Sequence, residues 1–374
     1  MKKIKFLDLE SQKDRLNNGI EFNIKKVLEH SKYIMGPEVK ELELKLQKYT
    51  KAKHCVTCAS GTDALILSLM ALKIGANDLV ICPSFTFPAT AEAILITGAK
   101  PYFVDVGLDT FNICYKELEK ILDKEHKKNK VKAIIAVDLF GLPANYARLN
   151  KIAKKYKVHI ISDGAQSFGG SLNNKKVGSL TKITCTSFFP AKPLGCYGDG
   201  GALFSDSKII SEKLVSLRAH GKGKSKYEIS EIGLNSRLDS IQAAILLAKL
   251  KIFNWELKER NKNAHLYNKE LKRYYHVPEI PKASSSAWAQ YTIRTRNRDK
   301  VLNFLNDKSI PTMIYYPVPM HMQPAYRKYN KYKNILKNSL KLSKTVLSIP
   351  VHSFLSNSQK EYIILNLIKA HKLV

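Results

Sequence analysis

The chain contains 374 residues, of which 44% are hydrophobic and 25% are charged. This composition is typical of a folded globular protein and excludes a disordered one, and the length favours about two or three domains of roughly 150 residues each. No apolar run approaches the roughly 18–20 residues of a membrane span. The first residues lack the apolar stretch of a signal peptide, and six cysteines are too few for a disulfide scaffold. We therefore expect a cytoplasmic protein that does not enter a membrane.

The net charge is +30, because 62 basic residues outnumber 32 acidic ones. Only ten of the basic residues are Arg, and the other 52 are Lys spread along the chain. A nucleic-acid-binding protein more often concentrates Arg and aromatic residues on one element. The pattern therefore favours solvated surface lysines and no nucleic-acid partner, with a basic protein that binds nucleic acid or an anionic surface as the rival interpretation. A positive field would also attract a polyanionic substrate such as a nucleotide diphosphate.

Short β-branched runs alternate with helical patterns over the first two-thirds of the chain. The expected strands are 54–58, 79–82, 101–104, 131–137, 159–162, 183–188 and 201–204, and the helical patterns between them are 62–72, 88–97, 144–156 and 208–218. This alternation is typical of a mostly parallel sheet covered by helices. We predict an α/β fold.

A long helix is expected over 239–262, after the last strand of this series. Its apolar residues fall on one stripe, namely Ile241, Ala244, Ile245, Ala248 and Ile252. Beyond it, from about residue 273, the pattern changes to a smaller mixed unit. We predict a large domain over 1–250 and a small C-terminal α/β domain over 251–374, connected by the long helix.

The first motif with chemical content is Ser60-Gly61-Thr62-Asp63, where an expected strand turns into a helix. Its small residues let the backbone approach a ligand, and the first amides of a helix have no partner inside the helix. Such an N-terminus binds phosphate through its N–H groups and its dipole. Taken alone, the motif is explained equally well by Ser60 or Thr62 acting as a helix cap.

Two further residues stand out in the same region of the expected sheet. Asp163 ends an apolar strand, at the edge where parallel sheets collect ligands, and a carboxylate there could hold a cationic ring nitrogen. In isolation, a helix cap or a turn is the simpler explanation of Asp163. Lys192 stands in the otherwise uncharged, aromatic and Gly-rich stretch 185–195. Burial there would lower the pKa of Lys192 and make it a better nucleophile for Schiff-base chemistry.

Together, a phosphate cradle, a strand-end carboxylate and an activated lysine match the phosphate, the pyridinium nitrogen and the aldehyde of pyridoxal phosphate (PLP). A metal site is not expected. Cys55 and Cys58 have C-x-x-C spacing, but no second pair follows at a zinc-like distance, and a buried strand explains both residues.

Ordered motifs along almost the whole chain carry a family resemblance. They are Phe6-Leu7-Asp8-Leu9, Met35-Gly36-Pro37-Glu38-Val39, Ser60-Gly61-Thr62-Asp63-Ala64-Leu65, Pro83-Ser84-Phe85-Thr86-Phe87, Ala89-Thr90-Ala91-Glu92-Ala93-Ile94, Asp138-Leu139-Phe140-Gly141, Asp163-Gly164-Ala165-Gln166-Ser167 and Tyr316-Pro317-Val318-Pro319-Met320-His321. The sequence resembles the DegT/DnrJ/EryC1/StrS family of PLP-dependent nucleotide-sugar aminotransferases. The stretch 186–202 is most similar to the subgroup acting on UDP-2-acetamido-3-keto sugars.

The resemblance implies a fold type I aminotransferase with a seven-stranded, mostly parallel sheet in its large domain. It implies PLP as the cofactor, L-glutamate as the amino donor and a nucleotide-linked keto sugar as the acceptor. The preferred acceptor is UDP-2-acetamido-2-deoxy-3-oxo-glucose or -glucuronate, for lipid A or surface polysaccharide synthesis. A 4-keto sugar, or a dTDP or GDP carrier, is the alternative.

The resemblance also implies roles for individual residues. Lys192 would form the Schiff base and shuttle the proton, and Asp163 would pair with the pyridinium. The other expected cofactor contacts are Gln166 to the ring hydroxyl, Phe87 to the ring face, and Gly61, Thr62 and Ser187 to the phosphate. Asn235 would reach the phosphate of the neighbouring subunit, which implies a homodimer with shared active sites. Candidate substrate contacts are Arg218, His220, Tyr316 and His321, of which Tyr316 and His321 could instead be a structural pair.

Overall fold

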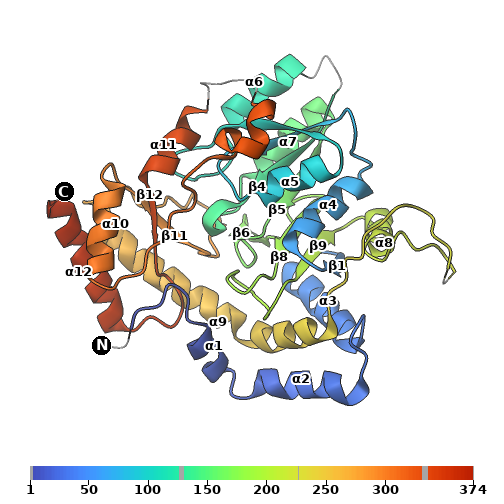
Figure 1. The fold of residues 1–374 in the computed structure, drawn as a ribbon, viewed down its shortest axis with the longest axis horizontal. Coiled ribbons are helices and arrows are strands. Elements are labelled where there is room, and N and C mark those ends of the chain that lie inside the picture. Colours follow the sequence, from blue (N-terminus) through green and yellow to red (C-terminus); the bar gives the residue numbers. More distant parts are fainter. Residues whose placement is uncertain (1–2, 126–129, 226, 331–335, 374) are drawn as a thin grey trace.

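A computed structural model describes residues 3–125, 130–225, 227–330 and 336–373. Its centre is a seven-stranded sheet with the strand order β1-β9-β8-β5-β4-β2-β3 (Figure 1). The strands are β1 (His54–Cys58), β2 (Leu79–Pro83), β3 (Lys100–Val104), β4 (Val131–Val137), β5 (His159–Asp163), β8 (Ile183–Ser187) and β9 (Gly201–Ser205). Strand β9 runs antiparallel to both of its neighbours, and the other neighbouring pairs are parallel. The predicted α/β fold with a seven-stranded, mostly parallel sheet is confirmed.

The strands form where the sequence is apolar on both faces, because helices cover both sides of the sheet. Alternate residues of β2 point to opposite layers. Val80 and Cys82 enter one core with α4 (Gly61–Ala71), α5 (Ala89–Ile96) and α8 (Lys208–Leu217). Leu79 and Ile81 enter the opposite core with α6 (Tyr115–Glu125) and α7 (Tyr146–Tyr156).

Helix α9 (Ser240–Leu271) extends nine residues beyond the predicted end. Its first half packs under β1 and β9 together with α3 (Pro37–Thr50). The helices α1 (Leu9–Arg15) and α2 (Gly19–His30) precede α3, and α2 lies along α9 through Ile20, Ile245 and Ala248 (Figure 1). These three N-terminal helices were not predicted from the sequence.

The C-terminal half of α9 belongs to a second, smaller core. That core contains a two-stranded antiparallel sheet of β11 (Tyr291–Arg294) and β12 (Val346–Ile349), flanked by α10 (Arg298–Asp307) and α12 (Asn357–Leu373). Ala264, Tyr267 and Leu271 of α9 are fully buried there. Ile4 is also part of this core, so the first residues of the chain lie with the C-terminal unit in space.

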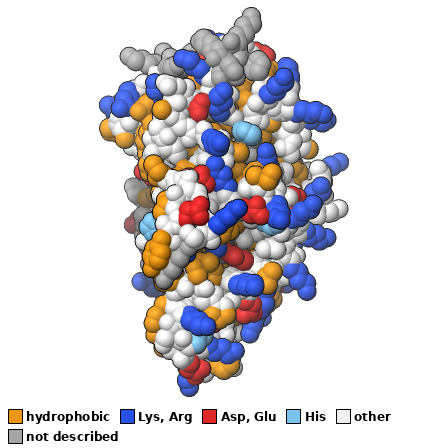
Figure 2. Space-filling model, turned by 90° about the vertical axis from the view of Figure 1, so that its right-hand side faces the viewer, with side chains coloured by type: hydrophobic (Ala, Val, Ile, Leu, Met, Phe, Trp, Pro, Cys, Tyr) orange, Lys and Arg blue, Asp and Glu red, His pale blue; other side chains and the backbone are white. Residues whose placement is uncertain are grey.

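The surface charge is dispersed on the face shown in Figure 2. Lys and Arg side chains alternate there with neutral and acidic ones and do not gather over one element. None of the described helices combines the length and the hydropathy needed to cross a bilayer.

Candidate active site

The site lies at the carboxyl edge of the large sheet, where the ends of β1, β5 and β8 meet the start of β9. Gly201 pairs with Cys58 of β1 on one side and with Ser187 of β8 on the other. A side chain at Gly201 would come within 2.3 Å of the carbonyl oxygen of Ser60. The absence of a side chain therefore lets the turn after β1 lie directly on this edge.

The turn after β1 is the segment that the sequence predicts as an anion cradle. Ser60 caps α4, because its Oγ accepts a hydrogen bond of 3.0 Å from the amide of Asp63. A Cβ atom on Gly61 would lie 2.6 Å from Cβ of Ser187, so Gly61 and the end of β8 are in direct contact. The amides of Gly61 and Thr62, which lack a partner within the helix, thus stand beside the Ser187 hydroxyl. A phosphate fits such a set of donors.

Asp163 ends β5 with a buried carboxylate, 7% exposed. Its Oδ2 accepts a hydrogen bond of 2.9 Å from Oγ1 of Thr90, and its Oδ1 accepts one of 3.3 Å from the amide of Ala165. Burial raises the pKa of Asp163, whereas these two donors and the nearby Lys192 lower it. A buried carboxylate with a raised pKa is stabilised in its charged form when a cation is brought to it.

Lys192 follows β8 on a turn closed by a hydrogen bond of 2.8 Å from its amide to the carbonyl of Phe189. Burial lowers the pKa of Lys192, and the negative charge of Asp163 opposes this effect. The lysine amine and the Asp163 carboxylate are therefore close enough to influence each other's titration. A lysine with a lowered pKa is more often unprotonated and is a better nucleophile than a surface lysine.

Aromatic rings line the side of the site formed by the segment after β2. The ring of Phe87 is 53% exposed, and its centroid lies 6.3 Å from that of Tyr316. Tyr316 accepts a hydrogen bond of 3.1 Å from Nε2 of Gln166, whose Oε1 accepts one of 2.6 Å from the amide of Phe140. The network fixes the Gln166 amide, and Phe87 offers an open aromatic face on which a flat ring can stack.

Asp138, directly after β4, belongs to one of the family motifs but was not predicted as a site residue. In the structure it supports the turn that carries Gln166. Its carboxylate is fully buried and accepts hydrogen bonds from Oγ of Ser167 at 2.7 Å, from the Tyr146 hydroxyl at 2.6 Å and from the amide of Ala144 at 2.8 Å. Burial raises the pKa of Asp138 to about 7. Because Ser167 directly follows Gln166, Asp138 holds the turn that carries Gln166. Asp138 could have been predicted from the sequence, because it is an acidic residue at the end of a strand that neighbours β5.

Arg218, a predicted substrate contact, lies inside the protein. Its side chain is 5% exposed and forms an ion pair of 2.6 Å with Glu43. The same guanidinium donates to the carbonyl oxygen of Thr57 at 2.8 Å. These bonds join α8 to α3 and β1, so the guanidinium is committed to the fold and is not directed at the site.

The remaining predicted residues are distributed differently. His321 is 1% exposed, with Nδ1 at 2.5 Å from Oγ of Ser84, and its Nε2 has no partner among the described residues. His220 and Asn235 are exposed on the loop after α8, and no hydrogen bond among the described residues ties their side chains to the site. Cys55 and Cys58 are buried in β1, and the described residues contain no group of three or more metal-ligating side chains.

The residues at the sheet edge fit PLP on structural grounds. Gly61, Thr62 and Ser187 would hold its phosphate, Asp163 its ring nitrogen, Gln166 its ring hydroxyl and Phe87 its ring face, with Lys192 beside its aldehyde. The tight Gly61–Ser187 contact and the buried carboxylate are the observations that support this fit. The fold and the site define a PLP-dependent enzyme of fold type I.

Comparisons identify the family. The model of the DegT/DnrJ/EryC1/StrS aminotransferase family matches residues 15–368, and the chain belongs to this family of PLP-dependent aminotransferases. The chain is 42% identical to the UDP-2-acetamido-2-deoxy-3-oxo-D-glucuronate aminotransferase of Pseudomonas aeruginosa, over 95% of this chain and 97% of the relative.

Two solved structures support the same assignment. A DegT DnrJ EryC1 StrS aminotransferase from Brucella abortus is 44% identical, with a TM-score of 0.96 over 98% of this chain and 99% of that chain. NtdA from Bacillus subtilis with bound cofactor PMP is 28% identical, with a TM-score of 0.90 over 100% of this chain and 86% of that chain. The expected family, fold type and cofactor are confirmed.

Proposed function

We propose that the protein transfers the amino group of L-glutamate to the C3 carbonyl of a UDP-linked 2-acetamido-2-deoxy-3-oxo-hexose of the glucose or glucuronate type. The observation that carries the proposal is the 42% identity to a relative of that activity, which extends over 95% of this chain and 97% of the relative. No domain of the relative is therefore missing here. Subgroup resemblance around Lys192 favours the same acceptor.

Lys192 and Asp163 have complementary tasks in this reaction. When bound, PLP supplies an aldehyde that accepts the amino group and a ring that withdraws electrons from the reacting carbon. The Asp163 carboxylate would stabilise a positive charge on the ring nitrogen. Because burial lowers the pKa of Lys192, its Nζ can accept the proton from Cα of glutamate and later deliver a proton to C3 of the sugar.

A homodimer with shared active sites is part of the proposal. The loop after α8 projects from the large sheet in Figure 1, and it carries the 85% exposed Tyr227 and the 86% exposed Ile232. Exposed apolar side chains on a projecting loop are typical of a segment that inserts into a partner. The loop ends near Asn235, which would contact the phosphate bound by the second subunit.

The shared site has a direct test. In a shared site, Lys192 and Asn235 come from different subunits. When the two inactive variants Lys192→Ala and Asn235→Ala are mixed, each heterodimer therefore has one site with both substitutions and one intact site. Mixing should restore about one-quarter of the wild-type activity. No restoration, although mixed dimers form, would contradict the shared site.

The setting that we propose is cytoplasmic synthesis of lipid A or a surface polysaccharide. The UDP carrier and glutamate are cytoplasmic metabolites, and an amino sugar nucleotide is a building block for such polymers. Neither a membrane nor a nucleic acid takes part in the proposed reaction.

The acceptor is tested in the reverse direction, because amino sugars are stable and keto sugars are not. Purified protein with PLP and 2-oxoglutarate is offered UDP-linked 3-amino sugars of the glucose and glucuronate types, and dTDP-linked 3-amino and 4-amino sugars as controls. We expect glutamate formation from a UDP-linked 3-amino sugar at a kcat/KM at least about tenfold above the others, with the reacting carbon assigned by NMR. A preference for a 4-amino or dTDP-linked sugar would overturn the proposed acceptor.

A further inference from the structure

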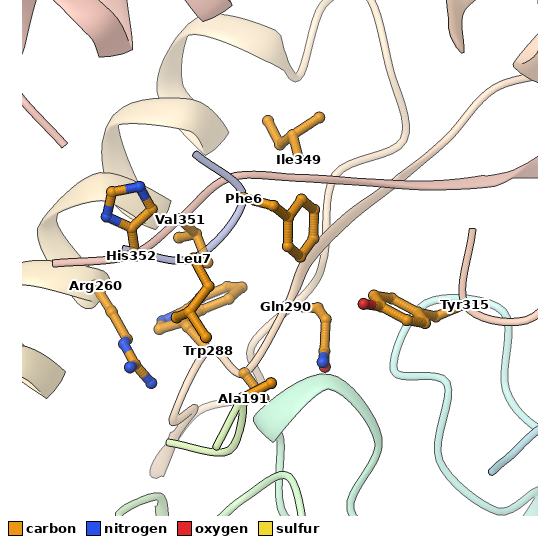
Figure 3. Close-up of a pocket in the computed structure, with 11 residues that line it drawn as sticks. Phe6, Leu7, Ala191, Arg260, Trp288, Gln290, Tyr315, Ile349, Val351 and His352 are labelled. Atoms are coloured by element: carbon orange, nitrogen blue, oxygen red, sulfur yellow. The ribbon is translucent and has the colours of Figure 1, made fainter. Parts of the chain in front are cut away.

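A small pocket lies between the segment that carries Lys192 and the C-terminal unit. Figure 3 shows side chains from the N-terminal segment, α9, the segment before β11 and the end of β12 around one space. Most of the lining is apolar or aromatic: Phe6, Leu7, Ala191, Trp288, Ile349 and Val351. The cavity volume is about 50 Å³. Because Ala191 directly precedes Lys192, the pocket adjoins the segment that carries the reactive lysine.

Arg260 is the cation of this pocket. Its side chain extends from α9 beside Trp288 and points toward Ala191 (Figure 3). Arg260 is only 5% exposed, yet its guanidinium makes no hydrogen bond or ion pair with any described residue. Glu256, one turn earlier on α9, accepts a hydrogen bond of 2.8 Å from Nε2 of Gln12. Burial lowers the pKa of Arg260 and the charge of Glu256 opposes this effect, but the two described side chains form no ion pair.

The other polar residues of the lining do not neutralise this charge. Burial lowers the pKa of His352 to about 4, so its ring is neutral near pH 7. Its Nε2 already bonds the carbonyl oxygen of Lys5 at 3.1 Å. Gln290 contributes an amide whose Oε1 is buried without a partner among the described residues. A guanidinium and an unsatisfied amide therefore face the same apolar space.

A buried guanidinium without a partner is costly, and a carboxylate is the ligand that matches its fork of N–H donors. The apolar walls suit the methylene groups that carry such a carboxylate. The cavity is far smaller than the roughly 300 Å³ of a site for a drug-sized ligand. It can admit one end of an amino acid but not a nucleotide sugar.

We propose that Arg260 binds a carboxylate of the dicarboxylic amino donor, and thereby makes the enzyme selective for glutamate. The inference rests on the proposed aminotransferase function and adds a residue that fixes the donor. Both glutamate and its keto product 2-oxoglutarate carry two carboxylates, so the same residue would serve each direction of the donor half-reaction. Sugar acceptors of the glucose type carry no carboxylate, so their half-reaction does not need Arg260.

The test separates the two half-reactions. Arg260→Met removes the charge at similar length, Arg260→Lys keeps a charge without the fork, and Arg294→Met is the matched control. Arg294 is 8% exposed and pairs with Asp109 at 2.8 Å on the other side of the small sheet. Bleaching of the cofactor absorbance reports the first half-reaction with glutamate, and with the UDP-linked 3-amino sugar of the glucose type. Thermal stabilisation by glutarate, a dicarboxylate without an amino group, reports binding without chemistry.

We expect Arg260→Met to raise the KM for glutamate at least about 30-fold and to abolish stabilisation by glutarate. We expect Arg260→Lys to recover part of the affinity for glutamate and part of the stabilisation by glutarate. In both variants, the rate with the glucose-type amino sugar should stay within about twofold of wild type. The amino acid 2-aminopentanoate, which lacks the γ-carboxylate, shows which carboxylate Arg260 binds. If Arg260→Met raises the KM for 2-aminopentanoate as much as the KM for glutamate, the ligand is the α-carboxylate. If it raises only the KM for glutamate, the ligand is the γ-carboxylate.

An unchanged KM for glutamate in Arg260→Met would overturn the inference, as would an equal loss with the glucose-type amino sugar. A loss seen only with the glucuronate-type amino sugar would assign Arg260 to the sugar carboxylate instead. If Arg260→Met does not fold, the KM of Arg260→Lys decides, and a wild-type value overturns the inference. Failure of the proposed acceptor would show as bleaching of the wild type by glutamate but by no UDP-linked 3-amino sugar.

Discussion

Replacing Asp163 by Asn should separate cofactor binding from stability. The substitution keeps the shape of the side chain and its hydrogen bond with Thr90, but it removes the charge. Burial raises the pKa of Asp163 by more than Thr90, Ala165 and the nearby Lys192 lower it, so the ionised form is disfavoured in the folded protein. The contribution of this carboxyl to stability is full at acid pH and is lost as the pH rises through its folded pKa. The cofactor-free Asp163→Asn protein should therefore be at least as stable as wild type at pH 8.

Binding of PLP should change in the opposite direction. A hydrogen bond to a charged group contributes about 1.5–3 kcal/mol, which corresponds to a Kd for PLP about 10–150-fold higher in Asp163→Asn. The Kd is measured by titrating cofactor-free protein with PLP and recording its absorbance, and stability is measured by urea unfolding of the same preparation.

A matched control is Asp105→Asn. Asp105 is also buried, 5% exposed, but it accepts hydrogen bonds from the amides of Val106, Asn338 and Ser339 and from the Ser339 hydroxyl, the last two residues lying at the start of α11 (Lys337–Thr345). This variant should leave the Kd for PLP within about twofold of wild type. The reasoning is refuted if Asp163→Asn binds PLP as tightly as wild type, or if it loses binding only because the cofactor-free protein is strongly destabilised.

Three further substitutions test the surroundings of the site. Gly61→Ala places a methyl group 2.6 Å from Cβ of Ser187, so urea unfolding should show a loss of about 1–3 kcal/mol, with weaker binding of PLP; unchanged affinity would argue against the cradle. Arg218→Ala removes the ion-pair partner of Glu43, which keeps only its hydrogen bonds from Thr57, and should lower the free energy of unfolding by about 3 kcal/mol. An unchanged urea midpoint would show that this ion pair is not structural. Asp138→Asn removes a carboxyl with a pKa of about 7. Relative to this variant, wild type should lose up to about 4 kcal/mol of stability as the pH rises from 4 to 8, and parallel pH profiles would contradict the assignment.

The sheet could be predicted closely from the sequence, and the helices less well. All seven strands lie within one residue of their predicted bounds, because strands buried on both faces are apolar throughout and are bounded by turn residues. The last part of α9 was missed because Asn263 weakens the local helical pattern just beyond the predicted end. Tertiary contacts override that weakness, since Nδ2 of Asn263 donates to the carbonyl oxygen of His352 at 2.9 Å.

The site was predictable where the chemistry depends on strand ends and not where it depends on packing. Lys192 and Asp163 are conspicuous in sequence, because each is a charged residue in an apolar segment. The ion pair of Arg218 with Glu43 joins residues 175 positions apart, and no local pattern reveals it. The guanidinium of Arg260 is equally invisible in sequence, because only the folded chain shows that it makes no ion pair with any described residue, although the charge of Glu256 acts on it.

The central claim is that Lys192, among 52 lysines, bonds covalently to the cofactor. Borohydride reduction of the PLP-loaded protein fixes the carbon–nitrogen bond, and peptide mass spectrometry then locates the pyridoxyl group. The account predicts modification at Lys192, and loss of that modification when glutamate is added before the reductant. Modification at another lysine such as the buried Lys249, or at none, would contradict it.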